Sequence, residues 1–525
     1  MRSNVAPIRK QSTPKSRLKT ESVKIRTLMD QYLGGHLLLP EFQRDLVWRP
    51  KRAPLLIDSL YRGYPISALL TWTSDEDLRA RHGPRHHFKK SVSWLIDGQQ
   101  RVNTLARIMQ GDDWADVVFN PDTEEFRLAN GATRRDRRWV SVSNLFDDDH
   151  YYELRRELPE DSTGRTREAR YEQVRAILDY EVPVVMMINH SFDEAVEAFT
   201  RLNTLGVKLR LADLASAQVA GKHSGFIADE VAPFLSELRD QGFSRLNAMY
   251  LFRVCEFIAA DNRARVPLHE LNLSDLRQAW NRTKNATAEA VTLLREEFGL
   301  QNMDILSSAA MFVPVIALCA YTPKSTRDQQ AIAGWLAAAA LSRRYRKGAD
   351  TLDQDLRVCR SEDPIGKLLA NIRRSGRGLL TTPNDFRGWL YDRGALFAVY
   401  AACHHKGLTD IFTNAPVLLS GSIERHHILP RSQFKSNDRF VADALANIAF
   451  ANADTSRAGG SRSPEGYMDR LAKLSQKALA SQCIPSDREL WLVDRAQEFW
   501  LKRQEKLSDA FNELLRTKLR RWKID

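Results

Sequence analysis

The sequence predicts an α+β fold in three parts: a mixed α/β domain, a helical middle region and a smaller domain toward the C-terminal end. Short apolar runs alternate with turn signals as far as about Leu214, which is typical of mixed structure. Helical and Ala-rich patterns then dominate as far as Gly376, and a paired-histidine motif follows. A chain of 525 residues exceeds the size of most single cores, so several domains are expected.

The expected domain boundaries follow these changes of pattern. Residues 1–23 are basic and polar without an apolar stretch, so we expect a disordered arm and no secretory signal. The mixed domain is expected at 24–215 and the helical region at 216–378. The last domain, 379–525, is expected to end in an amphipathic helix whose final turns are basic.

The composition favours a soluble protein of a reducing compartment and, only slightly, one that binds nucleic acid. The net charge of +12 favours polyanionic partners, although a merely basic soluble protein would carry the same charge. No segment is long and apolar enough to span a bilayer, so no membrane association is expected. The five cysteines form no CxxC pair, which argues against disulfides and structural zinc and favours a cytoplasmic location.

Two strand-like runs mark the mixed domain. The first, Val92 to Ile96, ends at the turn pair Asp97-Gly98, and helical spacing runs from Val102 to Met109. The second, Val182 to Ile188, precedes an expected helix near residue 196. The first run therefore predicts the order strand, tight polar turn, helix.

The turn from Asp97 to Arg101 combines a carboxylate, a glycine, two amides and a guanidinium. Gly98 permits a positive φ, helix-start N–H groups attract anions, and the Arg101 side chain can clamp phosphate oxygens. Such a turn suits the phosphates of a nucleotide or a DNA backbone. Taken alone, however, the segment is more often a purely structural turn.

Three further segments accompany this turn: Pro40 to Trp48, then Tyr64 to Ile66, and later Phe199 to Gly206. In this order the four segments resemble the N-terminal domain of the GmrSD-type, modification-dependent restriction endonucleases, over roughly residues 24 to 215. The resemblance implies a ParB-like fold and a site that binds or hydrolyses a nucleoside triphosphate (GTP, ATP or another). It places these residues at that site: Gln43, Arg44, Asp97, Gly98, Gln99, Gln100, Arg101, Arg201 and Asn203.

A second motif contains His426 and His427, at the end of a strand-like run that continues as Ile428-Leu429-Pro430. Adjacent histidines are usually incidental, but here Asn447 follows in an apolar run and a P-x-x-Y segment stands at 464–467. Together these features resemble the β-hairpin and helix of an HNH (ββα-metal) nuclease, over roughly residues 380 to 480.

The HNH resemblance implies a role for each residue of this motif. His427 would be the general base, His426 a ligand of a divalent ion (Mg²⁺ or Mn²⁺), and Asn447 the residue that orients the hairpin loop. The family usually has Asn before the Arg that opens the helix, whereas Ser456 stands here, and a hydroxyl is a poor ligand for a hard cation. The third ligand is therefore Ser456, water or another side chain, or it is lost. The alternative side chains are Asn452, Asp454 and Glu424.

Two basic clusters remain without a motif. Arg343, Arg344, Arg346 and Lys347 follow the helical run Ala331 to Leu341, and they suit either a DNA-facing patch or a solvated helix end. The basic last helix suits either DNA contact or dimerisation. A homo-oligomer is compatible with the sequence, which does not specify the oligomeric state.

Together the two resemblances imply a nucleotide-regulated, metal-dependent DNA endonuclease of antiviral defence, with modified phage DNA as the expected target. The main alternative is a nucleotide-dependent DNA-binding sensor with a degenerate, inactive HNH module, and Ser456 is the residue that supports it. A nuclease acting on RNA is a further alternative, because phosphodiester hydrolysis does not depend on base identity.

Overall fold

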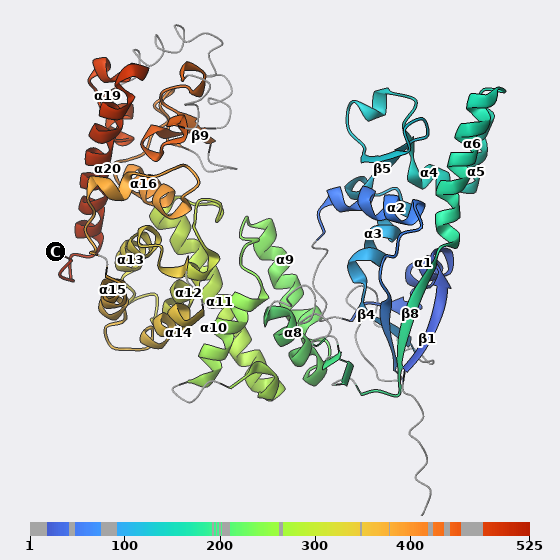
Figure 1. The fold of residues 1–525 in the computed structure, drawn as a ribbon. Coiled ribbons are helices and arrows are strands. Elements are labelled where there is room, and N and C mark those ends of the chain that lie inside the picture. The colour runs from blue at the N-terminus through green and yellow to red at the C-terminus, as the bar shows by residue number, and fades with distance from the viewer. Residues whose placement is uncertain are drawn as a thin grey trace, which may run out of the picture. The chain divides into compact units, whose positions relative to one another are not determined.

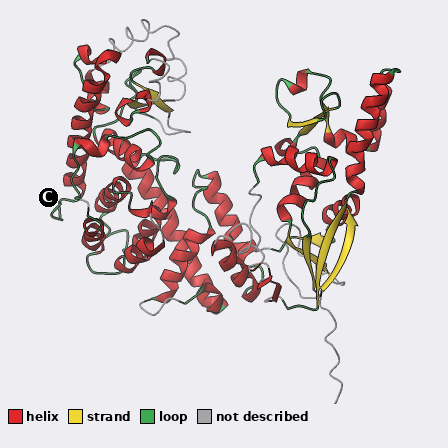
Figure 2. Ribbon diagram, in the orientation of Figure 1, coloured by secondary structure: helices red, strands yellow, loops and turns green. Residues whose placement is uncertain are grey.

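The protein is described by a computed structural model that divides into two compact units, Met1–Val231 and Ala232–Asp525. Strands gather mainly in the first unit and helices dominate the second (Figures 1 and 2). The α+β class predicted from the sequence is confirmed. The described residues are 18–40, 48–74, 92–191, 194–195, 197–198, 201, 211–261, 266–346, 349–376, 378–417, 424–434, 441–452 and 476–524.

A five-stranded mixed sheet forms the centre of the first unit. Its strand order is β1-β8-β3-β4-β2, with β1/β8 and β3/β4 antiparallel and β3/β8 and β2/β4 parallel. The two strands predicted from apolar runs are β4 and β8. The strand bounds are β1 Leu18–Lys24, β2 Leu37–Leu38, β3 Leu69–Ser74, β4 Val92–Asp97 and β8 Glu181–Ile188.

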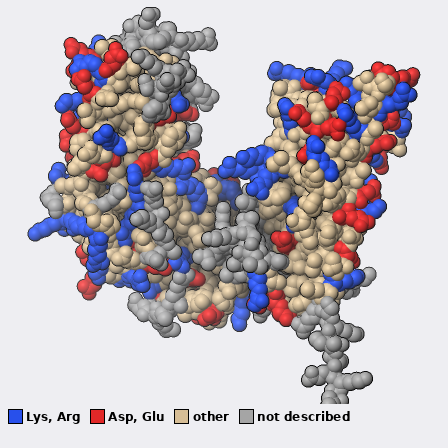
Figure 3. Space-filling view, in the orientation of Figure 1, with Lys and Arg blue, Asp and Glu red and all other residues tan. Residues whose placement is uncertain are grey.

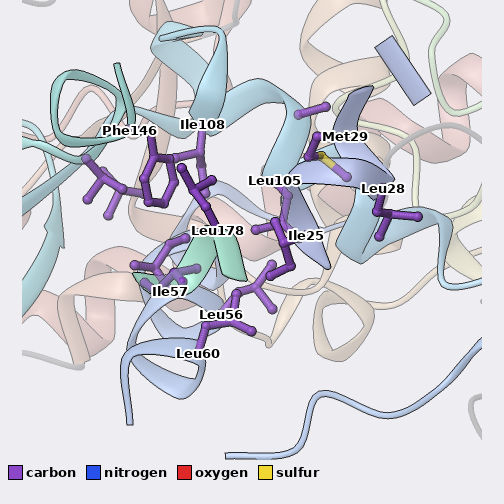
Figure 4. Packing of buried hydrophobic residues seen from close by; sticks show 14 of the residues in the cluster. Ile25, Leu28, Met29, Leu56, Ile57, Leu60, Leu105, Ile108, Phe146 and Leu178 are labelled. Atoms are coloured by element: carbon purple, nitrogen blue, oxygen red, sulfur yellow. The ribbon is translucent and has the colours of Figure 1, made fainter. Parts of the chain in front are cut away.

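Helices pack against this sheet through an apolar core. Figure 4 shows Ile25 and Met29 of α1, Ile57 of α2 and Leu105 of α3 meeting in one buried cluster. Burying each such side chain contributes about 1.5–3 kcal/mol to stability, so the core holds α3 and the turn before it in place. The helix bounds are α1 Ile25–Leu33, α2 Ala53–Tyr61 and α3 Gln99–Met109.

A smaller antiparallel sheet, of order β6-β5-β7, completes the unit together with further helices. The helix expected near residue 196 stays a prediction, because Val196 and Phe199, on which it was based, lie outside the described residues. The bounds are β5 Val117–Asn120, β6 Glu125–Leu128, β7 Val140–Ser141, α4 Val142–Phe146, α5 Asp148–Arg156, α6 Ser162–Arg175 and α8 Leu211–Lys222.

The second unit is helical apart from one short hairpin, among its described residues. The helix expected over Ala331 to Leu341 is α13, and all of these residues are buried, the large Trp335 among them. The helix bounds are α9 Ala232–Asp240, α10 Ala248–Ala260, α11 Leu273–Phe298, α12 Val313–Tyr321, α13 Gln329–Leu341, α14 Ala349–Val358, α15 Pro364–Arg374, α16 Arg393–His405, α19 Gln476–Ser481 and α20 Ala496–Lys518. Across the described residues, no helix combines the length and apolarity needed to cross a membrane.

The two described arginine side chains of the basic cluster after α13 are both engaged in ion pairs. The Arg344 side chain is 5% exposed and binds the fully buried Asp355 through two nitrogens, at 2.6 and 2.8 Å. Arg343 pairs with Asp392. The Arg346 side chain and Lys347 lie outside the described residues. The described arginines, Arg343 and Arg344, therefore stabilise the fold. For Arg344, neither interpretation offered by the sequence applies, since it forms neither a DNA-facing patch nor a solvated helix end.

The last helix, α20, is a packing element of the second unit. Its buried face includes Phe499, Leu507 and Phe511, and it packs against α13 and α16. Lys518 forms a largely buried ion pair with Glu297 at 2.6 Å. Because its apolar face is already covered, the helix does not offer that face for dimerisation.

Candidate functional sites

The first site is the turn between β4 and α3, where Gly98 is required by two constraints. Its φ of 101° lies in the left-handed region that side chains disfavour. A Cβ on Gly98 would also lie 2.1 Å from Leu69 Cδ2. The glycine therefore lets the chain turn sharply from Asp97 into the helix while β3 stays close.

Arg101 braces the segment that precedes β3. Its guanidinium donates to the carbonyl oxygens of Ile66, Ser67 (2.6 Å) and Ala68 (3.0 Å) and contacts Asp97 at 3.4 Å. Ser67 has a strained φ of 67°, which these bonds stabilise. Burial lowers the pKa of Arg101, and the charge of Asp97 opposes this shift. In this structure the Arg101 side chain is engaged by protein groups, whereas Asp97 stays partly exposed.

Gln100 connects the turn to the segment that ends in Trp48. Its side-chain oxygen accepts a hydrogen bond from the Trp48 backbone N–H at 3.1 Å, and the neighbouring Gln99 is buried. Three of the four sequence segments therefore meet at the start of α3, since Ile66 bonds to Arg101 there as well.

The remaining residues expected at this site are placed only in part. Arg201 is exposed and pairs with Glu197. Gln43, Arg44 and Asn203 lie outside the described residues.

The second site is a hairpin in which β9, Glu424–His427, pairs antiparallel with β10, Ile448–Ala451. His427 faces Ile448 and His426 faces Ala449 in the register of the two strands. This places both histidines on β9, at the point where the chain enters the loop between the strands.

Asn447, directly before β10, fastens that loop. Its Nδ2 donates to the carbonyl oxygens of Leu429 (2.9 Å) and Ala442 (2.8 Å), and its Oδ1 accepts from the Leu429 N–H at 2.8 Å. The side chain is completely buried, so these bonds are shielded from competing water. Asn447 therefore joins both ends of the loop that carries the residues after His427.

His427 is held by a carboxylate from this loop. Its Nε2 lies 3.0 Å from Asp443 Oδ1, and Arg431 lies 3.5 Å from Asp443 Oδ2. Asp443 is 7% exposed, whereas His427 is 25% and Arg431 54% exposed. Because a carboxylate accepts the proton of an imidazole N–H, this contact assigns the proton of neutral His427 to Nε2 and the lone pair to Nδ1.

His426, the neighbour of His427 on β9, is kept neutral by burial. Burial lowers the pKa of His426 to about 4; the charge of His427 adds to the lowering, and Asp410 opposes it. The rings of Phe412 and His426 pack nearly perpendicular to each other, with centroids 5.0 Å apart. A neutral imidazole is the form that binds a transition metal, so His426 fits the ligand role chemically.

A complete set of ligands is not found in the described part of the chain. No group of three or more His, Cys, Asp or Glu side chains with metal-binding geometry occurs among the described residues. Ser456 and Asp454 lie outside them, and the Asn452 amide nitrogen donates to Pro416 at 3.3 Å. Glu424 begins β9 and is half-buried. The described donors therefore fit a divalent ion only in part, with His426 as the clearest one.

The hairpin is anchored to the helices of its own unit. Arg503 of α20 is completely buried and donates to the carbonyl oxygens of Ala446 (2.8 Å) and Gln482 (3.1 Å). The Gln482 side chain bonds both backbone groups of Phe450 in β10. These contacts make the hairpin part of a rigid core, as the positioning of a catalytic side chain requires.

Sequence reasoning missed Asp443, Arg431 and Asp410. Asp443 stands four residues before Asn447 in a largely apolar run, and nothing in that pattern connects it to His427. Arg431 directly follows the Ile428-Leu429-Pro430 segment, which is a usable but weak signal.

Comparison with known protein families identifies the first site's domain. Residues 25–220 match the family model described as the GmrSD restriction endonuclease, N-terminal domain. The N-terminal part of this chain is therefore a GmrSD-type domain, as its four sequence segments indicated, and a restriction nuclease with DNA as partner is the role that this family suggests. No curated protein matches the chain.

Proposed function

We propose that the protein is a nucleotide-regulated, divalent-metal-dependent DNA endonuclease of the HNH type that restricts foreign DNA, with modified phage DNA as its target. The observation that carries the proposal is the hairpin on which Asp443 holds His427, in a chain whose first domain belongs to a restriction endonuclease family.

In the proposed reaction, His427 takes the proton of the water that attacks phosphorus. Asp443 keeps the imidazole oriented and stabilises its positive charge once the proton has been transferred. Arg431, half-exposed beside Asp443, binds a non-bridging phosphate oxygen of the strand to be cut. A divalent ion, held by His426 and by further donors, would supply positive charge for the phosphate and the leaving oxygen.

In the first domain, we propose that the turn before α3 binds or hydrolyses a nucleoside triphosphate. The partly exposed Asp97 carboxylate is suited to orient water or a bound ion, and the N-terminus of α3 favours an anion. Because Arg101 is occupied by three carbonyl groups, its part is to hold the turn together.

The nuclease is tested by cleavage of unmodified plasmid, modified phage DNA and RNA, with Mg²⁺ or Mn²⁺ and with or without triphosphates. His427→Ala should abolish cutting and leave DNA binding intact. His150→Ala, which alters an exposed histidine of α5, is the matched control and should cut normally. Cutting that survives His427→Ala would exclude the proposed base, and cutting of RNA alone would exclude DNA as the substrate.

The nucleotide site is tested by calorimetry with GTP and ATP. Asp97→Ala should lose triphosphate binding or hydrolysis with the fold intact, whereas Asp149→Ala on the exposed start of α5 should bind normally. Unchanged affinity in Asp97→Ala would mean that the turn is structural or belongs to DNA contacts.

The second candidate function is a nucleotide-dependent DNA-binding sensor whose HNH module is inactive. It is favoured by Ser456, which stands where the family usually has an Asn ligand. In that case the wild type cuts nothing under any condition, and Ser456→Asn restores cutting.

A further inference from the structure

Two large aromatic side chains are exposed in the segment that leads into α16. Trp389 is 47% and Tyr391 78% exposed, and they are the exposed large aromatics among the described residues of the second unit. The other exposed large hydrophobics of that unit are leucines. Two neighbouring exposed aromatics are suited to a partner with flat apolar faces.

This segment is joined to the hairpin loop by backbone pairing. The Leu390 N–H donates to the Asp443 carbonyl at 2.9 Å, and the Leu445 N–H donates to the Gly388 carbonyl at 2.8 Å. Trp389 thereby forms an antiparallel bridge with Ala444, the residue after Asp443. The same short loop thus connects the Trp389 backbone to the carboxylate that holds His427.

Positive charge flanks the two aromatics. Arg387 and Arg393 are both exposed, on either side of them in the chain, and Arg431 lies beside Asp443. The one acidic residue between Arg387 and Arg393 is Asp392, which pairs with Arg343 and caps α16. Figure 3 shows basic and acidic side chains interspersed over both units on the face that it presents. Aromatics set among basic groups match the flat bases and charged backbone of a nucleic acid strand.

We propose that Trp389 and Tyr391 form a stacking platform for unpaired nucleobases of the DNA strand next to the cut, with Arg387 and Arg393 on its phosphates. This inference rests on the proposed function of the His427 site. Paired backbones lie about 4.8 Å apart, so the backbone of Trp389 runs directly beside that of Ala444, the residue after Asp443.

The platform binds bases that are unstacked, because the faces of stacked bases in an intact duplex are covered by their neighbours. A strand that is gapped, frayed or distorted near the cut exposes such faces. Trp389 and Tyr391 thus favour a locally opened duplex over an intact one and position its strand for attack.

The test is DNA binding by fluorescence anisotropy in the His427→Ala background, which prevents cutting during the measurement. The probes are a duplex with a short single-stranded gap, the intact duplex and single-stranded RNA of the same sequence. Trp389→Ala and Tyr391→Ala should each weaken binding to the gapped duplex by about 5- to 100-fold, and binding to the intact duplex less. Trp389→Phe should restore most of the affinity.

Tyr152→Ala is the matched control, because Tyr152 is similarly exposed on α5 of the first unit, and its affinities should not change. Thermal unfolding of each variant identifies any loss of fold. Unchanged binding in folded Trp389→Ala and Tyr391→Ala would overturn the platform, as would a loss confined to RNA or shared by Tyr152→Ala. These readouts do not depend on catalysis, so failure of the platform and failure of His427 as the base are distinguishable.

Discussion

The contact between Asp443 and His427 leads to a kinetic prediction for Asp443→Ala. The carboxylate is almost buried and lies 3.0 Å from Nε2, so its removal leaves the imidazole without the group that orients it. General base catalysis contributes about 10²- to 10⁴-fold to rate, and a misoriented base loses a large share of this. We expect kcat to fall about 100-fold, equivalent to about 2.7 kcal/mol in the barrier. KM should change little, because Arg431 remains to bind phosphate.

The assay is steady-state cleavage of a labelled duplex at saturating and limiting DNA, which gives kcat and KM separately. Asp443→Asn keeps an oxygen acceptor for Nε2–H and should lose less activity than Asp443→Ala. In His427→Ala the added Asp443→Ala change should cause no further loss, because Asp443 acts through His427. Wild-type kcat in folded Asp443→Ala, or a further loss in the double variant, would refute this reasoning.

Three further predictions concern stability and thiol chemistry. Gly98→Ala should destabilise the first unit by about 1–3 kcal/mol in thermal or chemical unfolding. Gly131→Ala, which adds a Cβ into open space, should not destabilise it, and equal effects of the two substitutions would contradict the close-packing argument. Asp355→Asn leaves the buried charge of Arg344 uncompensated and should cost about 3–5 kcal/mol in denaturant unfolding; a loss below about 1 kcal/mol would show that the pair is dispensable. Burial raises the pKa of Cys255 from 9.0 to about 12, so iodoacetamide at pH 9 should leave it unmodified until the protein unfolds. Since the native state keeps a proton that the unfolded state loses, this thiol lowers the unfolding free energy as the pH rises from about 9 toward 12. Rapid labelling of Cys255 in the folded protein would contradict the raised pKa.

Much of the first domain followed from local pattern. The apolar runs, the glycine turn and the helical spacing between 92 and 109 predicted β4, the Gly98 turn and α3. The four ordered segments also predicted the GmrSD-type domain that the family match over residues 25–220 confirms. Local pattern did not show the structural role of Arg101. Its guanidinium binds carbonyl oxygens of residues 33 to 35 positions earlier in the chain.

At the histidine site, too, the sequence predicted some features and gave no sign of others. The position of His426 and His427 on a strand and of Asn447 before an apolar strand could be inferred from nearby residues. The Asp443 contact, by contrast, depends on the path of the loop that Asn447 fastens, and the bridge from Trp389 to Ala444 joins residues 55 positions apart. Neither contact has a periodicity or a turn signal that would indicate it.

The sequence by itself determined the periodic elements, the turn that demands glycine and the chemical types of the candidate site residues, because each depends on residues a few positions apart. Tertiary structure alone decided the strand order β1-β8-β3-β4-β2, the burial of the Arg344 and Arg503 side chains, and the pairing of His427 with Asp443. It also brings together the thiols of Cys403 and Cys483, eighty residues apart, so that each shifts the pKa of the other. The physical reason is that such contacts arise when distant segments share one core, and the energy of that packing is not a property of any single stretch of chain.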